Sequence, residues 1–377
     1  MQLTREQVCE LTSRKLAAAA PSLGDVRALV GLDGFVDEII AVVDKRHDNA
    51  TYDAVKTIDQ LGRKIAGATG HSSNYELVVK QMKLGGNGPL MANALSSAGM
   101  GVTYVGALGY PNVHPVFEDF AKRTTVISIA EPAHTDALEF EDGKLMLGKL
   151  TPLDEVTWDN LIARLGRERF KQLMAQSRLI GMVNWTMLPH MSRIWAQMLD
   201  DVIPDAERRT RKLFVDLADP EKRTHEDILD ALRLLTRFQN QIDVILGLNL
   251  KESVEIADVL GLPGARDPED AIESNAAAIR AALNVACVVI HPRRGAAAAT
   301  ETEVAHFAGP FVQQPKISTG AGDHFNAGFC LGCVLGFSLP QSLCVGVGLS
   351  GFYVRTGVSP TAQQLSDFIA DLPPPQG

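Results

Sequence analysis

Short β-rich runs alternate with longer helical stretches along most of the chain, and this alternation restricts its fold more than any other feature. Stretches in which apolar residues recur at helical spacing among polar ones separate most of these runs. Strands separated by helices build βαβ units, so we expect an α/β fold with a mainly parallel sheet sandwiched between helices. The expected strands cover residues 28–32, 102–106, 179–183, 212–217, 244–247 and 286–290. Expected helices include residues 89–98, 191–202, 224–238 and 250–260.

Two segments interrupt this alternation. Residues 38–84 begin with an apolar run at 39–43, turn polar, and contain an expected helix over 52–65. Residues 125–150 are typical of a hairpin, with β-rich runs at 126–129, 137–140 and 145–147 around a turn at 141–144. We expect these two segments to form a small β-containing lid, within a single domain that covers residues 1–377. The lid would cover the sheet edge where right-handed crossovers gather the loops that follow the strands.

Charge and cysteine content exclude several classes of protein. The 377 residues include 36 Lys and Arg against 45 Asp and Glu, which gives a net charge of −9. Such a chain has no net positive field to attract a nucleic-acid backbone, so we expect no nucleic-acid partner. The odd number of cysteines indicates a reducing compartment rather than a disulfide scaffold. Cys330 and Cys333 form a CxxC in an apolar helical stretch, which predicts core thiols rather than a zinc or redox site.

An uncharged stretch over residues 325–354 could be mistaken for a membrane span. Gly336 and Pro340 interrupt it, and Ser338 with Gln341 has the spacing of a capping box. Two buried helices joined by a short turn explain the stretch better. Residues 1–20 lack the long apolar core of a signal peptide. We therefore expect a cytoplasmic protein with no membrane partner.

The sharpest chemical signal is the stretch TGAGDHFNAG at residues 319–328. Gly320 and Gly322 allow a close backbone approach to a ligand, and the apolar helix after them would direct free N–H groups at an anion. Asp323, in the first turn of that helix, is placed to accept a proton. Donors for phosphate charge beside a base are what phosphoryl transfer requires. A tight turn in which Asp323 only caps the helix remains an alternative at this point.

TGAGDxFxAG resembles the C-terminal signature of the PfkB/ribokinase family of carbohydrate and nucleoside kinases. The resemblance implies a ribokinase-like fold with a small lid, in which Asp323 is the catalytic base and Gly320, Ala321 and Gly322 form the anion hole. It also implies ATP and Mg²⁺ as cofactors and transfer of the γ-phosphate to a hydroxyl group of a sugar or sugar-like small molecule. Two alternatives stay open: a nucleoside kinase on the same fold, and a sugar or nucleotide sensor without catalysis.

Two further segments are similar to the acceptor-binding parts of this family. The turn Gly85-Gly86-Asn87 looks like the N-terminal signature that contacts the sugar, although Leu90 stands where the family usually has Asn. After the first strand, Asp37 fits the family's hydroxyl-binding aspartate best because the apolar run 39–43 follows it, and Asp33 is a second candidate contact. An aromatic lid would favour a nucleoside, but the expected lid is not notably aromatic, with Tyr52 and Tyr75 as its main candidates, so a sugar is favoured.

The expected nucleotide side combines weaker signals. Asn249 and Glu252 match the family's NxxE motif, in which Glu252 would organise Mg²⁺ through water. Arg293, Gly295 and Asn326 are the other candidate nucleotide contacts. Ile317 replaces an aspartate that supports a potassium site in some members, so potassium activation is not expected. We expect His324 to lie on the helix surface, and a homodimer is possible because lid-to-lid dimers are common among similar proteins.

Overall fold

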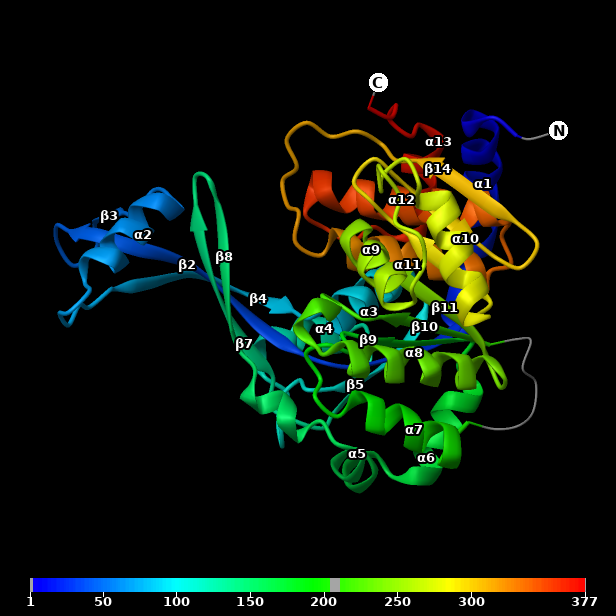
Figure 1. Cartoon of the computed structure of the whole chain (residues 1–377), viewed down its shortest axis with the longest axis horizontal. Helices are drawn as coiled ribbons and strands as arrows, with labels where there is room; N and C mark the ends of the chain where they lie inside the picture. Colours follow the sequence, from blue (N-terminus) through cyan, green and yellow to red (C-terminus); the bar gives the residue numbers. More distant parts are fainter. Residues whose placement is uncertain (1–2, 204–210, 377) are drawn as a thin grey trace.

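The computed structural model describes residues 3–203 and 211–376, and a large sheet forms its centre (Figure 1). In this part of the chain the sheet contains β1 (Arg27–Leu32), β5 (Gly101–Gly106), β6 (Thr125–Ser128), β9 (Leu179–Val183), β10 (Lys212–Asp216), β11 (Asp243–Leu248), β12 (Cys287–Ile290), β13 (Gly295–Ala299) and β14 (Val304–Ala308). The strand order is β14-β13-β12-β11-β10-β9-β1-β5-β6. The strands from β12 to β6 in this order pair in parallel, whereas β13 pairs antiparallel with both β12 and β14.

Helices cover both faces of this sheet, as expected for buried parallel strands. One face packs against α1 (Arg5–Ala19), α3 (Asn87–Ser97), α4 (Glu118–Ala121), α11 (Ala321–Val334), α12 (Leu339–Thr356) and α13 (Ala362–Ala370). The other packs against α5 (Trp158–Leu165), α6 (Arg167–Gln176), α7 (Met191–Asp201), α8 (His225–Gln239), α9 (Leu250–Val259) and α10 (Ile272–Leu283). Short 3-10 turns are η1 (Ala20–Asp25), η2 (Pro115–Phe117), η3 (Thr151–Glu155) and η5 (Pro220–Lys222).

A second, smaller sheet projects to one side of the main body in Figure 1, and we call it the small sheet. In the described residues it consists of β2 (Phe35–Arg46), β3 (Tyr52–Ala54), β4 (Leu77–Gly85), β7 (Ala133–Phe140) and β8 (Gly143–Lys149). Its order is β3-β2-β7-β8, and β4 pairs with β2. α2 (Ile58–Gly67) packs on one face over a small apolar core, which contains Ile40, Val42, Val55, Leu61 and Leu138.

The structure confirms the six expected strands, the four expected helices, and the division of residues 325–354 into two helices. α12 begins after Ser338, whose side chain forms a capping box with Gln341. The alanine-rich strands β13 and β14 were not predicted because alanine has little preference for strands. All five cysteines, each in the described part of the chain, are free thiols, and Cys330 is fully buried. Among residues 3–203 and 211–376, no helix has both the length and the apolar character needed to cross a membrane.

Three expectations about the small sheet need correction. The expected helix over 52–65 is a short strand, Tyr52–Ala54, followed by α2, which begins after its N-cap Thr57. The apolar run 39–43 is only the middle of the long strand β2. Residues 125–128 form β6 and pair with β5 in the main sheet, so the hairpin of the small sheet begins at Ala133. A local pattern predicts a strand, but tertiary contacts decide which sheet receives it.

Candidate active site

Polar side chains gather where the parallel strands of the main sheet end. Asp33 follows β1, Asn184 follows β9, and Asp216 is the last residue of β10. Asn249 and His291 come directly after the neighbouring strands β11 and β12. Because parallel strands end at the same edge, these five residues form one polar cluster at the carboxyl edge of the sheet, which we call the rim. The small sheet and the N-terminus of α11 adjoin this rim.

Asp33 is completely buried and its carboxylate has protein partners on both oxygens. Oδ1 accepts from the Gly88 N–H at 2.9 Å, and Oδ2 accepts from the Asn184 amide at 2.8 Å. The Tyr104 hydroxyl donates to the Asp33 main-chain carbonyl at 2.6 Å and lies 3.2 Å from Oδ1. Burial raises the pKa of Asp33 to about 6. Asn184 was not predicted, although an asparagine after a buried strand was visible in the sequence. Its left-handed backbone, φ 60°, is one that asparagine tolerates better than most residues.

Asp37 lies on β2 of the small sheet and is less buried than Asp33. Its carboxylate sits directly against Gly85, where a Cβ would overlap the carboxylate atoms. Burial raises the pKa of Asp37, while a hydrogen bond from Thr135 and the charges of Lys144 and Lys83 oppose that rise. The turn Gly85-Gly86-Asn87 therefore lies between Asp37 on one side and Asp33 on the other, and Gly86 has a φ of 96° that favours glycine.

Asp323 is buried in the first turn of α11, and Asn87 is its side-chain partner. The Asn87 amide donates to Asp323 Oδ1 at 3.0 Å. Burial raises the pKa of Asp323 to about 8, and the neighbouring charges of Asp33 and Glu252 add to that rise. A carboxyl with a pKa this high, at the edge of a site, has the properties of a general base.

The turn before α11 presents backbone donors next to Asp323. Gly320 is the N-cap of the helix, with a φ of 87° that is costly for residues with a side chain. The Ala321 N–H donates to the Ser318 carbonyl at 3.2 Å. Within the described residues, the N–H groups of Gly320 and Gly322 have no acceptor. Of the three expected anion-hole groups, the structure therefore leaves the N–H groups of two available to a ligand.

Buried carboxylates Asp216 and Glu252 form the next part of the rim. Asp216 accepts from the Asn326 amide at 2.7 Å and from the Ala218 N–H at 2.9 Å. Glu252 forms a reciprocal capping box with Asn249 at the start of α9. Burial raises the pKa of both carboxyls, and for Asp216 the charges of Glu252 and Asp323 raise it further. Asp216 was not predicted, and its signal was an acidic residue at the end of an apolar run.

These carboxylates are suited to a hard cation. Among the described residues, no three His, Cys, Asp or Glu side chains are grouped closely enough to bind a metal by themselves. Mg²⁺ needs no such cage, because one or two carboxylates, water and phosphate oxygens complete its coordination. Asp216 and Glu252 repel each other in the apoprotein, and the buried Asn326 Oδ1 has no partner there. The donor set therefore fits a magnesium–phosphate group.

The candidate nucleotide contact Arg293 lies in the loop that follows β12, next to Arg294. Arg293 and Arg294 are exposed, and the Arg294 guanidinium is 3.7 Å from Glu269. Gly295 is buried at the start of β13. His291, which was not predicted, lies near the start of α11: a Cβ on Gly322 would come within 3.3 Å of its ring. Burial lowers the pKa of His291 to about 4, and its buried Nε2 has no partner in the described chain.

The expectation that His324 lies on the helix surface is wrong. Its side chain is fully buried, bonds to the Gly320 carbonyl and to Ser359, and stacks on Tyr353. The reason is that α11 packs against α12 and α3 as well as the sheet, so most of its circumference lies in the core. A helix without charged residues along most of its length is typical of such a position.

The geometry agrees with comparisons to known proteins. A ketohexokinase of Haloferax volcanii is 29% identical over 344 residues, which are 91% of this chain and 90% of that protein. The Arabidopsis thaliana ribokinase complexed with ribose and ATP superposes with a TM-score of 0.62 at 14% identity. The superposition covers 92% of this chain and 99% of that ribokinase. The Thermotoga maritima ribokinase has a TM-score of 0.59 at 17% identity, over 92% of this chain and 99% of that chain.

These structural likenesses confirm the ribokinase-like fold. The profile of the prokaryotic ketohexokinase family matches residues 4–372, which is almost the whole chain. The prediction of a carbohydrate kinase of the ribokinase type is confirmed at this level. The chain therefore belongs to the prokaryotic ketohexokinase family.

Proposed function

We propose that this protein transfers the γ-phosphate of ATP to a hydroxyl group of a ketohexose. Family membership and the likeness to the Haloferax volcanii ketohexokinase support this class of acceptor. The observation that carries the proposal is the buried Asp323 carboxyl, which lies in the same turn as the available N–H groups of Gly320 and Gly322. Phosphoryl transfer requires this pairing of a base with donors for phosphate charge.

In the proposed mechanism, Asp323 accepts the proton of the attacking hydroxyl. The Asn87 amide holds one carboxylate oxygen, so the other remains directed at the acceptor. The N–H groups of Gly320 and Gly322, at the positive end of α11, stabilise the charge on the transferred phosphoryl group. The peptide of Ala321 contributes by shaping the turn through its bond to Ser318.

The acceptor would bind between the small sheet and the rim. We assign the acceptor hydroxyls to Asp37 and Asn87, because both oxygens of Asp33 already have protein donors. Gly85 and Gly86 would let the backbone approach the sugar, since neither presents a side chain there. Asp33 would not contact the acceptor. Its carboxylate would instead hold the N–H of Gly88, next to the turn Gly85-Gly86-Asn87, in a fixed position.

The nucleotide and Mg²⁺ would bind on the far side of Asp323 from the small sheet. Asp216 and Glu252 would hold the magnesium-bound water, and Asn249 would keep Glu252 in place through their capping box. Mg²⁺, when bound, neutralises charge on the phosphates. Asn326 and the backbone at Gly295 are the remaining candidate nucleotide contacts. Arg293 would have to turn from its exposed position to reach a phosphate, so we assign it a lesser role.

We also propose a homodimer through the outer face of the small sheet. β4 is an edge strand, and Leu77, Val79 and Met82 on it are 45%, 43% and 53% exposed. The register with β2 places all three on one face. Exposed apolar side chains on an edge strand normally acquire a cover, and a second copy of the same face supplies a complementary one.

The proposed function is tested by measuring ADP release from Mg-ATP with ketohexoses, aldohexoses and nucleosides as acceptors. We expect release with a ketohexose, and its loss in Asp323→Asn. Asp230→Asn, on the exposed side of α8, is the matched control and should keep the wild-type rate. Release with nucleosides alone would instead support a nucleoside kinase. ATP binding without release for any acceptor would contradict catalysis and support a sensor.

A further inference from the structure

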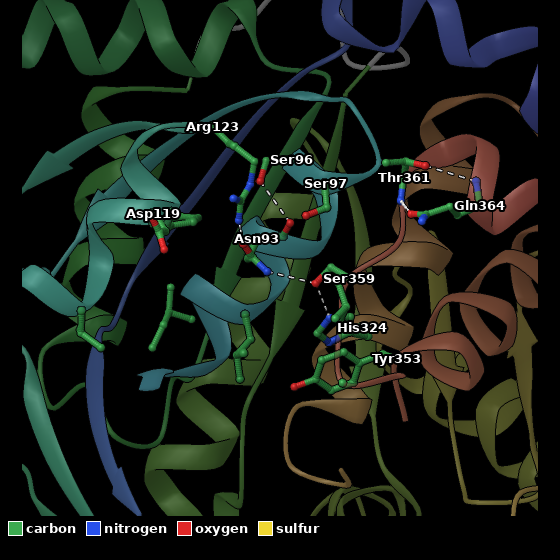
Figure 2. A pocket seen from close by; sticks show the side chains of 16 residues that line it. Asn93, Ser96, Ser97, Asp119, Arg123, His324, Tyr353, Ser359, Thr361 and Gln364 are labelled. Atoms are coloured by element: carbon green, nitrogen blue, oxygen red, sulfur yellow. Dashed lines mark hydrogen bonds between the residues drawn. The ribbon is translucent and has the colours of Figure 1, made fainter. Parts of the chain in front are cut away.

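His324 follows the proposed base directly but serves a different part of the molecule. Its side chain lines a groove of about 590 Å³ between α3, α4 and the loop before α13. Figure 2 shows Asn93, Ser359 and His324 in a row across this groove, with Tyr353 beneath the histidine ring. Nothing in the proposed chemistry so far uses these four side chains, although one of them adjoins Asp323 in the sequence.

Four hydrogen bonds run in sequence from Arg123 through this row to the phosphoryl-transfer turn, and the donor of each can be assigned. The Gly320 carbonyl can only accept, so His324 donates to it from Nδ1 at 2.7 Å, and His324 Nε2 accepts from the Ser359 hydroxyl at 2.8 Å. Arg123 can only donate, and it donates to Asn93 Oδ1 at 2.6 Å. The Asn93 amide therefore donates to Ser359 Oγ at 3.0 Å. Burial lowers the pKa of His324 to about 4, so the ring is neutral near pH 7 and Nε2 accepts from the Ser359 hydroxyl.

A second side chain holds the carbonyl next to that of Gly320. The Tyr353 ring stacks on the His324 ring with centroids 3.5 Å apart and an angle of 13°. The Tyr353 hydroxyl donates to the Thr319 carbonyl at 3.2 Å. In a trans peptide the C=O and N–H groups point in opposite directions. Holding the Thr319 carbonyl therefore sets the direction of the Gly320 N–H, which is one of the two available donors of the turn.

We propose that His324 is a positioning residue for phosphoryl transfer. Its side chain holds the Gly320 turn in its anion-binding geometry, and the hydrogen bonds from Arg123 through Asn93 to Ser359 hold His324 in place. This inference rests on the proposed function of the turn. Glycine at 320 makes such support necessary, because its backbone has more freedom than that of any other residue. A purely structural histidine would only fill space between α11 and α12.

Three substitutions separate these roles, and a fourth serves as a control. His324→Phe keeps an aromatic ring that can stack on Tyr353 but loses both hydrogen bonds. His324→Asn has an amide near the position of Nδ1, so it retains a donor for the Gly320 carbonyl and loses the bond to Ser359. Ser359→Ala removes the same link from the other side with the smallest change in volume. Cys333→Ala, at the far end of α11, is the control for altered packing in this helix.

We expect His324→Phe to lower kcat roughly 10- to 100-fold, less than the loss of a direct oxyanion donor. The KM values for the ketohexose and for ATP should stay within about two-fold, since a positioning residue acts mainly on the transition state. His324→Asn should recover kcat only to about the level of Ser359→Ala, because both variants keep the donor to the Gly320 carbonyl and lose the bond between positions 324 and 359. Ser359→Ala should lower kcat in the wild-type background and have little further effect in His324→Phe, because the two residues act in one row.

The same assay includes wild type and Asp323→Asn, with the folded fraction of each variant measured by circular dichroism. Wild-type kcat in folded His324→Phe, or equal losses in His324→Asn and His324→Phe with an independent loss from Ser359→Ala, would overturn the positioning role. If His324→Phe does not fold, wild-type kcat in Ser359→Ala overturns it. Wild type without ketohexose-dependent turnover would overturn the proposed function and this inference together. Active wild type with inactive Asp323→Asn and active His324→Phe would overturn this inference alone.

Discussion

At the scale of single residues, the Asp323 carboxyl lies in surroundings that oppose its own charge. Burial is the largest cause of its raised pKa, and the charges of Asp33 and Glu252 act in the same direction. The Asn87 amide is a neutral donor and offsets only part of this effect. A base with a pKa near the working pH combines a usable basic form with enough strength to remove a proton.

The first prediction concerns the pH dependence of the reaction. Because the pKa of Asp323 is about 8, kcat/KM should rise with pH and approach a plateau above that value. Asp323→Asn should lose this rise together with roughly 10²–10⁴-fold of the rate. The measurement is kcat/KM between pH 6 and 9.5 at fixed ionic strength. A flat profile across this range in the wild type would contradict the assignment of the base.

The second prediction concerns stability. The folded pKa of Asp323, about 8, exceeds the value of about 3.9 for an unfolded aspartate. The folded state therefore holds more protons between about pH 4 and pH 8, and this carboxyl costs increasing stability as the pH rises through that window. Asp323→Asn should raise the free energy of unfolding on the order of a few kcal/mol at pH 8, and much less at pH 5.

Thermal unfolding at the two pH values measures this effect. Asp230→Asn is the control, since that carboxyl is exposed on α8. A gain in stability that is equal at pH 5 and pH 8 would show that the charge of Asp323 is not its source.

At the scale of elements, the start of α9 combines helix capping with the proposed binding of magnesium. Asn249 Oδ1 accepts from the Glu252 N–H at 3.0 Å, and Glu252 Oε2 accepts from the Asn249 N–H at 2.8 Å. The other Glu252 oxygen accepts from the Asp219 N–H at 3.0 Å, which ties α9 to the loop after β10. One local motif therefore both begins a helix and holds a carboxylate at the rim.

Asn249→Ala and Thr224→Ala should separate these two effects. Both residues are N-caps with a capping box, so each change should cost about 1 kcal/mol in unfolding by urea. Only Asn249→Ala should raise the KM for Mg-ATP, because it releases Glu252. An unchanged KM for Mg-ATP in Asn249→Ala would argue against a role of Glu252 in metal binding.

The pairing of β2 with β4 supports the assignment of Asp37. A Cβ at Gly85 would overlap the Asp37 carboxylate, so Gly85→Ala should displace that side chain. We expect a several-fold higher KM for the ketohexose and an unchanged KM for ATP. Gly148→Ala in β8, where the new Cβ would meet only the Leu150 side chain, is the control. Equal effects of the two changes would mean that the sheet, and not Asp37, was disturbed.

At the scale of the whole molecule, the small sheet projects from one side of the main body and forms a layer of its own there (Figure 1). It has its own small core under α2, and its strand β2 carries Asp37, the proposed acceptor contact. The N-terminal helix α1 and the C-terminal helix α13 pack side by side on the main body, away from this layer. Contacts along β2 and β7 are thus what position the acceptor side of the site.

The proposed dimer gives a test at this scale. Val79→Asp places a charge on the exposed face of β4, so it should convert a dimer into a monomer without unfolding the main body. Light scattering after gel filtration measures the mass, and circular dichroism checks the fold. Asp53→Asn, an exposed change on β3, is the control. A wild-type protein that elutes as a monomer at micromolar concentration would contradict the proposal.

Local patterns determined much of this protein. The alternation of strands and helices identified the main sheet, since burial of parallel strands leaves uninterrupted apolar runs. The motif at residues 319–328 indicated the region of the proposed base through its resemblance to the ribokinase-family signature, because its glycines and carboxylate alone left a simple capping turn as an alternative. Asn249 and Glu252 were noticed in the same way, as a match to the family's NxxE motif directly after a strand.

Tertiary structure alone decided the rest. Asp216 and Asn184 reach the site because distant strands end at one edge, and no local pattern distinguishes them from other polar residues after strands. β6 joins the main sheet, although by sequence it could equally have paired in the hairpin, because register and partner are set by long-range packing. His324 is buried because Tyr353 of the following helix α12 stacks on its ring, and this burial lowers its pKa so that the ring is neutral. The sequence by itself determined most strands and helices of the main body and the chemical motif. The distances between these elements and the protonation of their side chains depend on contacts that only the folded chain makes.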